Sequence, residues 1–253
     1  MSERTHTWSR QARGAWTIAK KNAMLYYLKP PVLIFGVLFP IFFFLAFKMG
    51  RSIPPARIVP GMIAMALWFT ASAVGPLVTP WERMARTYER LISTPLHLRT
   101  IILGDVLSGF IFGAVFTLVP IALGVAVTDV AVSSALLLGA GLLLGALAFS
   151  SLGVLLASPP VTSPSHIMML SNLVRLPLIF VSGVFVPISE MPGWARWLAP
   201  ISPLSYAVDL IRGGFGQPIY FPLWVSLPVL LAFIVAMLWA ACMFHHHWRA
   251  RGL

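Results

Sequence analysis

The chain has 253 residues, of which 58% are hydrophobic and 10% charged, and its mean hydropathy is +0.87. A soluble globular domain carries about 25% charged residues, so this composition excludes that class and indicates an integral membrane protein. The formal net charge of +11 would suggest a nucleic-acid partner in a soluble protein. Here the basic residues lie mainly between apolar runs, where they set the membrane topology.

The N-terminal segment 1–29 is polar and basic, and it lacks the short apolar core of a cleaved signal peptide. Within it, residues 8–28 mix apolar side chains such as Trp16 with basic ones such as Lys20 and Lys21. That mixture predicts an amphipathic helix in the inner membrane interface. The alternative is a basic tail with an aromatic anchor.

Six apolar runs are long enough to cross a membrane, which takes about 20 residues in a helix. They cover residues 30–47, 58–79, 106–127, 130–157, 167–186 and 222–244. The first run is short and contains Pro40, and the third and fourth are separated only by Thr128 and Asp129, which predicts a tight helical hairpin. The predicted fold is therefore an all-α polytopic membrane protein whose residues 30–253 form one transmembrane domain.

The distribution of basic residues predicts the orientation. With the N-terminus inside, twelve of the eighteen Lys and Arg residues lie in inner segments, five lie in outer segments and Arg175 lies within a run. Basic residues are retained on the cytoplasmic side, so both termini are predicted to be cytoplasmic in a multi-pass protein of the cell membrane.

The inner segment 80–100 is unusually charged. Glu82 and Arg86 have the i,i+4 spacing of a helical ion pair, and Thr94-Pro95 is expected to end the helical stretch. On its residues alone, this segment is a solvated loop that sets orientation.

The outer segment 187–221 is too apolar for an ordinary surface loop, yet its prolines exclude one long span. Two short helices that dip into the outer leaflet, over about 192–199 and 203–213, fit this pattern. Asp209 and Arg212, three residues apart, would neutralise each other there.

Motifs for catalysis are missing from the sequence. It contains no GxxxxGK[ST] nucleotide loop and no zinc-binding spacing, and Cys242 is its one cysteine. The adjacent histidines 245–247 point in different directions on a helix, so we expect no metal site. No acidic residue lies near the middle of a predicted span, which argues against ion-coupled transport. Energy is therefore expected to come from outside the chain.

Arg175 is the one ionisable residue well inside a predicted span. Such a residue is costly in the membrane and is a functional candidate by default. Two interpretations are open: it lies on a substrate path and binds an anionic group, or its long side chain extends to the inner interface.

Residues 176–215 carry a pattern of an SG-F-P block, a P-W pair, an SPL triplet and then Y, D and R. The matching residues are Ser182, Gly183, Phe185, Pro187, Met191, Pro192, Trp194, Ser202, Pro203, Leu204, Tyr206, Asp209 and Arg212. In this pattern the chain resembles the type-2 ABC transporter permeases, the group that includes daunorubicin-resistance-type and nodulation-type export permeases.

The inner segment adds a second likeness, to the family pattern E-R-x-x-G-T-x-E-x-L-x-x-T-P-L. The matching residues are Glu82, Arg83, Thr87, Glu89, Leu91, Thr94, Pro95 and Leu96. Arg86 stands where the family pattern has Gly, which is a departure in the turn before Thr87.

The resemblance implies a permease that pairs as a dimer, most simply a homodimer, with an ATP-binding subunit on the cytoplasmic face of each copy. ATP and magnesium would then bind the partner subunits, and this chain would hold no cofactor and no catalytic residue. The inner segment would be the coupling helix, the outer one a re-entrant pair over the translocation path, and the mechanism alternating access.

The implied activity is export of an amphipathic drug-like or lipid-like substrate. A polysaccharide or lipid-linked glycan is the alternative substrate. A membrane-embedded enzyme acting on lipid would need a cluster of Asp, His or Ser at one leaflet, which the sequence lacks, and an assembly partner without transport is the remaining alternative.

Overall fold

The computed structural model describes most of the chain outside the first predicted span. The described residues are 2–26, 54–94, 96–128, 130–159 and 163–250, with a few positions between 34 and 46. The predicted span over 30–47 therefore lies largely outside them.

The described part of the chain is helical and contains no strand. Its α-helices are α1 (Ser2–Tyr26), α4 (Pro55–Met84), α5 (Thr87–Ile92), α6 (Leu98–Val127), α7 (Ala135–Ala157), α8 (Pro164–Val181), α9 (Gly193–Leu198), α10 (Pro203–Gly214) and α11 (Leu223–Ala250). Two 3₁₀ turns, η2 (Ile188–Glu190) and η3 (Ala199–Ile201), flank α9. Five helices (α4, α6, α7, α8 and α11) are long and apolar enough to span a membrane.

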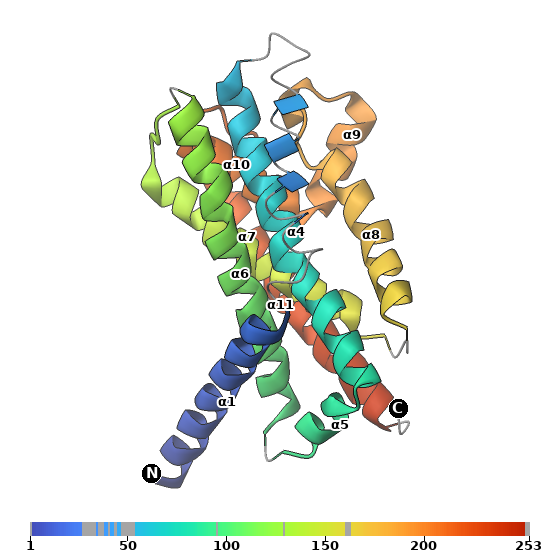
Figure 1. Cartoon of the computed structure of the whole chain (residues 1–253). Helices are drawn as coiled ribbons and strands as arrows, with labels where there is room; N and C mark the ends of the chain where they lie inside the picture. The colour runs from blue at the N-terminus through green and yellow to red at the C-terminus, as the bar shows by residue number, and fades with distance from the viewer. Residues whose placement is uncertain are drawn as a thin grey trace.

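Helix α4 forms the centre of the bundle (Figure 1). Its most apolar stretch is 94% buried, against 17% for α11, because α6, α7, α8 and α10 all pack on it. Trp68 is fully buried and meets Phe149 of α7 edge to face, with ring centroids 4.8 Å apart. Pro60, Pro76 and Pro80 lie inside α4 without ending it. Such prolines are tolerated where neighbouring helices satisfy the freed backbone groups.

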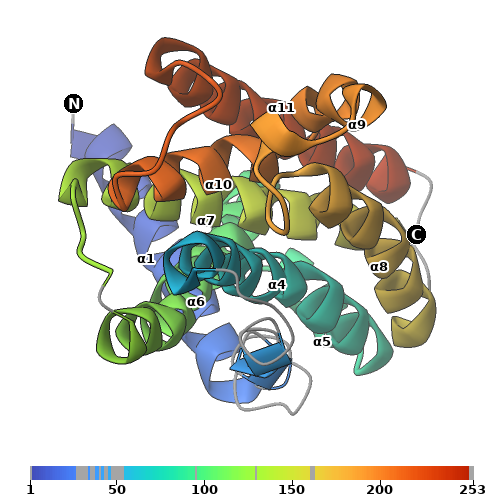
Figure 2. The ribbon, with the colours of Figure 1, turned by 90° about the horizontal axis from the view of Figure 1, so that it is seen from above.

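Helix α7 lies between α4 and α6 on one side and α10 and α11 on the other (Figure 2). It crosses α4 at glycines: a Cβ on Gly75 would collide with the Gly153 carbonyl, and one on Gly153 with the Ser72 carbonyl. The two backbones therefore approach more closely than side chains would allow.

The predicted tight hairpin between the third and fourth spans is wrong. Helix α6 starts at Leu98, eight residues before the start of the predicted third span. Helix α7 starts at Ala135, five residues after the start of the predicted fourth span. The link 128–134 is longer because Ser134 caps α7, accepting a bond from the Leu137 N–H (3.3 Å), and because Ser133 N–H donates to the Gly214 carbonyl (2.9 Å).

The other predicted spans within the described residues agree in position and differ at their ends. Helix α4 continues to Met84, past the predicted end at Thr79, and α11 continues to Ala250. Helix α8 stops at Val181, five residues early, because the chain turns at Gly183 with φ of 86°. The two predicted short outer helices are confirmed as α9 and α10.

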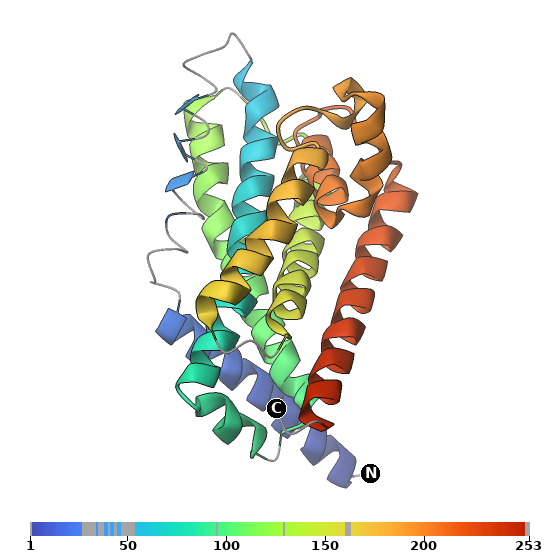
Figure 3. The same cartoon turned by 90° about the vertical axis from the view of Figure 1, so that its right-hand side faces the viewer.

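Helix α1 crosses the end of the bundle that carries α5 and the C-terminus (Figure 3). It packs mainly on α6 and buries Ile18 and Ala19, while Trp16, Met24 and Leu25 stay more than half exposed. This one-sided burial fits the predicted amphipathic helix in the interface.

Candidate functional site

The predicted coupling segment is a short helix, α5, held between α4 and α6. The last turn of α4 closes with the Ala85 N–H on the Trp81 carbonyl (2.9 Å), and the Arg86 N–H binds the Arg83 carbonyl (3.1 Å). Thr87, which starts α5, donates its hydroxyl to the Glu82 carbonyl (3.2 Å). These bonds fix the angle at which α5 leaves α4.

Arg86 occupies the turn in the left-handed region, with φ of 52°. Glycine adopts this conformation without steric cost, whereas a residue with a Cβ is strained by about 1–2 kcal/mol. A glycine here, as in the family pattern, would adopt this conformation without that strain.

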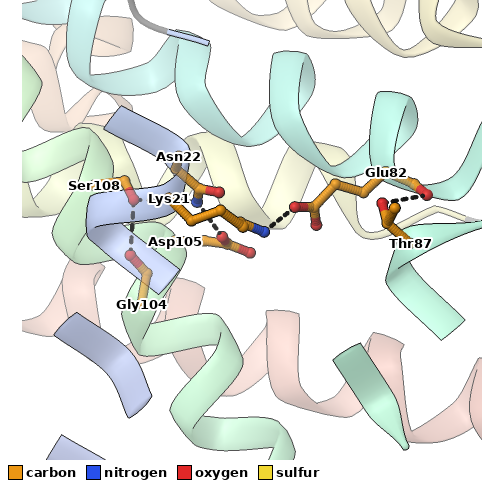
Figure 4. Close-up of polar contacts among 7 residues, drawn as sticks. All are labelled: Lys21, Asn22, Glu82, Thr87, Gly104, Asp105 and Ser108. Carbon is orange, nitrogen blue, oxygen red and sulfur yellow. Dashed lines mark hydrogen bonds and ion pairs between the residues drawn. The ribbon is translucent and has the colours of Figure 1, made fainter. Parts of the chain in front are cut away.

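A buried polar cluster joins α1 to the coupling segment (Figure 4). The Lys21 ammonium forms an ion pair with the Glu82 carboxylate. The next residue, Asn22, is fully buried and donates its amide to Asp105 (2.7 Å) and to Ser108 (3.1 Å) of α6. The predicted pair between Glu82 and Arg86 is wrong, because α4 ends at Met84 and Arg86 has left the helical path.

Further contacts attach the same segment to its neighbours. The Gln11 side-chain oxygen of α1 accepts bonds from the His97 N–H (3.2 Å) and the Thr100 hydroxyl at the start of α6. On the other side, the Arg83 guanidinium donates to the carbonyls of Pro159 (2.6 Å) and Ser158 (3.4 Å), between α7 and α8. The two ends of the segment that contains α5 are therefore attached to α1 on one side and to the link between α7 and α8 on the other.

Two predicted coupling residues, Glu89 and Pro95, are placed with less detail. The backbone of Glu89 lies in α5, but its side chain falls outside the described atoms, as does Pro95 entirely. Thr94 donates its hydroxyl to the Leu91 carbonyl (2.6 Å) and closes the end of α5, and Leu96 packs against Gly14 of α1.

Asp209 and Arg212 interact through their opposite charges, as predicted, while their hydrogen bonds go to other groups of the cap. Asp209 accepts bonds from the backbone N–H groups of Tyr220 (2.8 Å) and Phe221 (2.7 Å), before α11. Arg212 donates to the Gly183 carbonyl (2.7 Å), after α8, and to Gln217 (3.3 Å). Burial raises the pKa of Asp209, while these backbone bonds and the Arg212 charge oppose the shift.

The remaining outer motif residues cap and space the short helices. Ser182 donates to the Ile179 carbonyl (2.7 Å), and Tyr206 donates to the Pro200 carbonyl (3.2 Å). Pro187 precedes η2, Pro192 precedes α9 and Pro203 begins α10. Helix α10 is buried along its whole length, whereas Trp194 of α9 is 67% exposed. The motif is thus a structural cap with an aromatic outer rim.

Arg175 points into the bundle, where its side chain packs between α8 and α4. Its side chain is 3% exposed and donates to the Ser72 hydroxyl of α4 (3.2 Å) and to the Asn172 side-chain oxygen (3.0 Å). The Phe69 ring lies 6.0 Å from its guanidinium carbon. The predicted residue therefore lies at a contact between α8 and α4.

Sequence reasoning missed five residues that make the polar contacts described above: Lys21, Asn22, Asp105, Ser72 and Asn172. On α1, Lys21 and Asn22 come shortly after the apolar residues Ile18 and Ala19. This order was the one local signal in the sequence that the buried face of α1 also contains polar residues. Among the residues that the structure describes, no group of three His, Cys, Asp or Glu side chains could hold a metal ion.

The architecture defines the class first. It is that of a multi-pass helical membrane protein with a charged helical segment at one end of the bundle and a cap of short helices at the other. Residues 13–216 match the ABC-2 type transporter family, and the chain belongs to that family as a permease subunit. Permeases of this family work with an ATP-binding subunit, and the chain itself is a non-catalytic transport subunit.

Two kinds of relative illustrate the match. The chain is 28% identical over 205 residues to nodulation protein J of Bradyrhizobium diazoefficiens, covering 78% of this chain and 76% of the relative. It is 28% identical over 179 residues to the inner membrane transport permease YadH of Escherichia coli K12, covering 71% and 70%.

Proposed function

We propose that the chain is the permease of an ATP-driven exporter and that α5 is its coupling helix. The observation that carries this proposal is that segment 82–100, which includes the end of α4, α5 and the start of α6, is contacted by α1 and by the link between α7 and α8. A subunit docked on α5 would move these elements together.

The proposed assembly contains two copies of this permease, most simply identical, and two ATP-binding subunits on the cytoplasmic side. ATP and magnesium bind to those ATP-binding subunits. When the two subunits close on ATP, they pull the coupling helices, and the translocation path opens alternately to each side of the membrane. Both termini are cytoplasmic in this arrangement, on the same side as α5, and the protein lies in the cell membrane.

The proposed substrate is an amphipathic drug-like or lipid-like molecule. The exposed faces of the spanning helices are apolar, and α8 and α11 bury only 22% and 17% of their most apolar stretches within one chain. A path next to such faces suits a molecule with a large apolar body.

Co-purification tests the coupling role. The permease would be expressed with a candidate ATP-binding subunit and purified in a mild detergent, comparing wild type with Arg90→Glu. Arg90 is exposed on α5, so its charge reversal should weaken the association at least tenfold without unfolding the permease.

The matched control is Arg57→Glu, an exposed residue at the opposite end of α4 with the same change of charge. It should leave the association unchanged. Equal retention of the ATP-binding subunit by wild type and Arg90→Glu would contradict the coupling role, and no association of wild type with any such subunit would overturn the exporter assignment.

A further inference from the structure

Arg175 lies deep in the membrane-spanning part of the bundle. It is the twelfth of 18 residues in α8, which places it about 16 Å from the start of the helix at 1.5 Å per residue. Its partner Ser72 lies in the middle third of α4. The guanidinium is thus held within the bundle, about three turns from the start of α8 at Pro164 and about two turns from its end at Val181.

Among the side chains that the structure describes, no carboxylate pairs with this charge. The sequence has seven acidic residues, and none lies on α8 or between residues 4 and 81. Of the four whose side chains are described, Glu82 pairs with Lys21, Glu190 with Arg57, Asp105 binds Asn22, and Asp209 binds backbone N–H groups. The remaining three are Glu3 in α1, Glu89 in α5 and Asp129 between α6 and α7.

Neutral groups surround the guanidinium instead. The oxygens of Ser72, Asn172 and the Ser171 backbone accept its N–H groups at 3.2, 3.0 and 3.4 Å. The Ser171 hydroxyl, one turn away on the same face of α8, is buried without a hydrogen-bond partner within the described structure. A buried cation without a counter-ion is expensive, and an unpaired hydroxyl adds to that cost.

The groups also have the chemistry to receive an anion. Arginine presents five N–H donors in a planar fork that matches a phosphate or carboxylate, and three neutral acceptors do not exhaust them. The Asn172 amide and the Ser171 hydroxyl can add donors on the same side, and Phe69 supplies an aromatic surface for an apolar neighbour.

We propose that Arg175, with Ser72, Asn172 and Ser171, forms a mid-membrane site for the anionic group, a phosphate or carboxylate, of an amphiphilic substrate. This proposal rests on the exporter function and narrows its substrate class. In the present state the neutral oxygens hold the guanidinium, and the site becomes occupied when an anion replaces them as α8 and α4 separate.

Direct binding to the full-length permease tests this site without the ATP-binding subunit. The probe is radiolabelled decyl phosphate, added to protein purified in decyl maltoside. Wild type should show saturable binding that unlabelled decyl phosphate displaces at least tenfold better than decylphosphocholine, whose choline cancels the charge. Arg175→Gln should bind at least tenfold more weakly.

Two further variants keep the test decisive if Arg175→Gln does not fold. Arg175→Lys keeps the charge and loses the fork, so it should bind three- to tenfold more weakly. Arg57→Gln removes the same charge at the outer end of α4 and should bind as wild type does.

The outcomes separate the proposal from its alternatives. Undiminished binding in both Arg175 variants, or equal displacement by decylphosphocholine, would overturn the site. Displacement by phosphatidylglycerol as effective as by decyl phosphate would mean that a membrane lipid fills it and would overturn the substrate role. Failure here with intact binding of an ATP-binding subunit would leave the exporter function standing.

Discussion

Arg86 departs from the family pattern at a backbone position that favours glycine. The turn between α4 and α5 needs a left-handed residue, and Arg86 adopts that conformation with φ of 52°. The neighbouring bonds of Ala85 and Arg86 to α4 carbonyls hold it there. A strained residue is kept where its surroundings determine the conformation.

Replacing Arg86 by glycine should therefore stabilise the permease. Relief of the left-handed strain is worth about 1 kcal/mol after the greater chain entropy of glycine is subtracted. Thermal unfolding of the purified protein in detergent would measure the gain. The control Arg90→Gly, in the helical backbone of α5, should instead lose about 1 kcal/mol. A loss of stability in both variants would contradict the assignment of strain to Arg86.

The ion pair between Lys21 and Glu82 joins groups of unequal burial. The Glu82 side chain is 4% exposed and the Lys21 side chain 33% exposed. Removing the lysine leaves a carboxylate in a dry site, whereas removing the carboxylate leaves an ammonium that can turn toward water.

We therefore expect an asymmetric response in unfolding experiments. Lys21→Met should cost about 3 kcal/mol, since it strands a buried charge, and Glu82→Gln about 1 kcal/mol. The adjacent Lys20→Met is the control, because Lys20 is exposed, and it should change stability by less than about 0.5 kcal/mol. Equal losses for the two pair members would show that the pair is not buried as described.

At the scale of the element, the crossing of α4 and α7 organises the bundle. Gly75 and Gly153 allow carbonyl groups of the facing helix to approach where any Cβ would collide with them. The same crossing holds Ser72, so it also places the acceptor of Arg175. Small residues at such contacts supply the close packing that drives helix association in lipid.

Alanine at either position should force the two helices apart. Gly75→Ala and Gly153→Ala should each cost about 3 kcal/mol or prevent folding, because backbone cannot move aside as a side chain can. Gly139 of α7 has no atom within 4 Å of an added Cβ, so Gly139→Ala should be neutral or stabilise by up to about 1 kcal/mol. Yield of monodisperse protein and its unfolding midpoint would be measured, and a tolerated Gly75→Ala would contradict the crossing.

On the scale of the whole molecule, the structure separates two ends of different chemistry. One end carries α1, α5 and the C-terminus, and the other carries the α9 and α10 cap with its exposed tryptophans (Figure 1). A coupling role for α5 requires the first end to face the cytoplasm.

Cysteine labelling in intact cells tests this orientation. With Cys242→Ser as background, Ser189→Cys in η2 should react with a membrane-impermeant maleimide, and Ser93→Cys beside α5 should react only after the membrane is opened. Both serines are exposed, so access to the reagent rather than burial decides the result. Labelling of Ser93→Cys alone in intact cells would place α5 outside and contradict coupling to a cytoplasmic subunit.

The sequence alone determined the membrane class, five of the spans, the two outer helices and the position of the charged inner segment. These features follow from local apolar length, proline positions and charge, which are properties of contiguous residues. Residues 30–47 remain a predicted span on this basis alone.

Only the tertiary structure decided which polar groups meet. Glu82 contacts Lys21 rather than Arg86, Asp209 and Arg212 bind backbone of separate loops, and Arg175 contacts Ser72, which is 103 residues away in the chain. The reason is physical: a buried polar group binds whichever partner the packed helices bring within reach, and helix packing depends on contacts far apart in sequence.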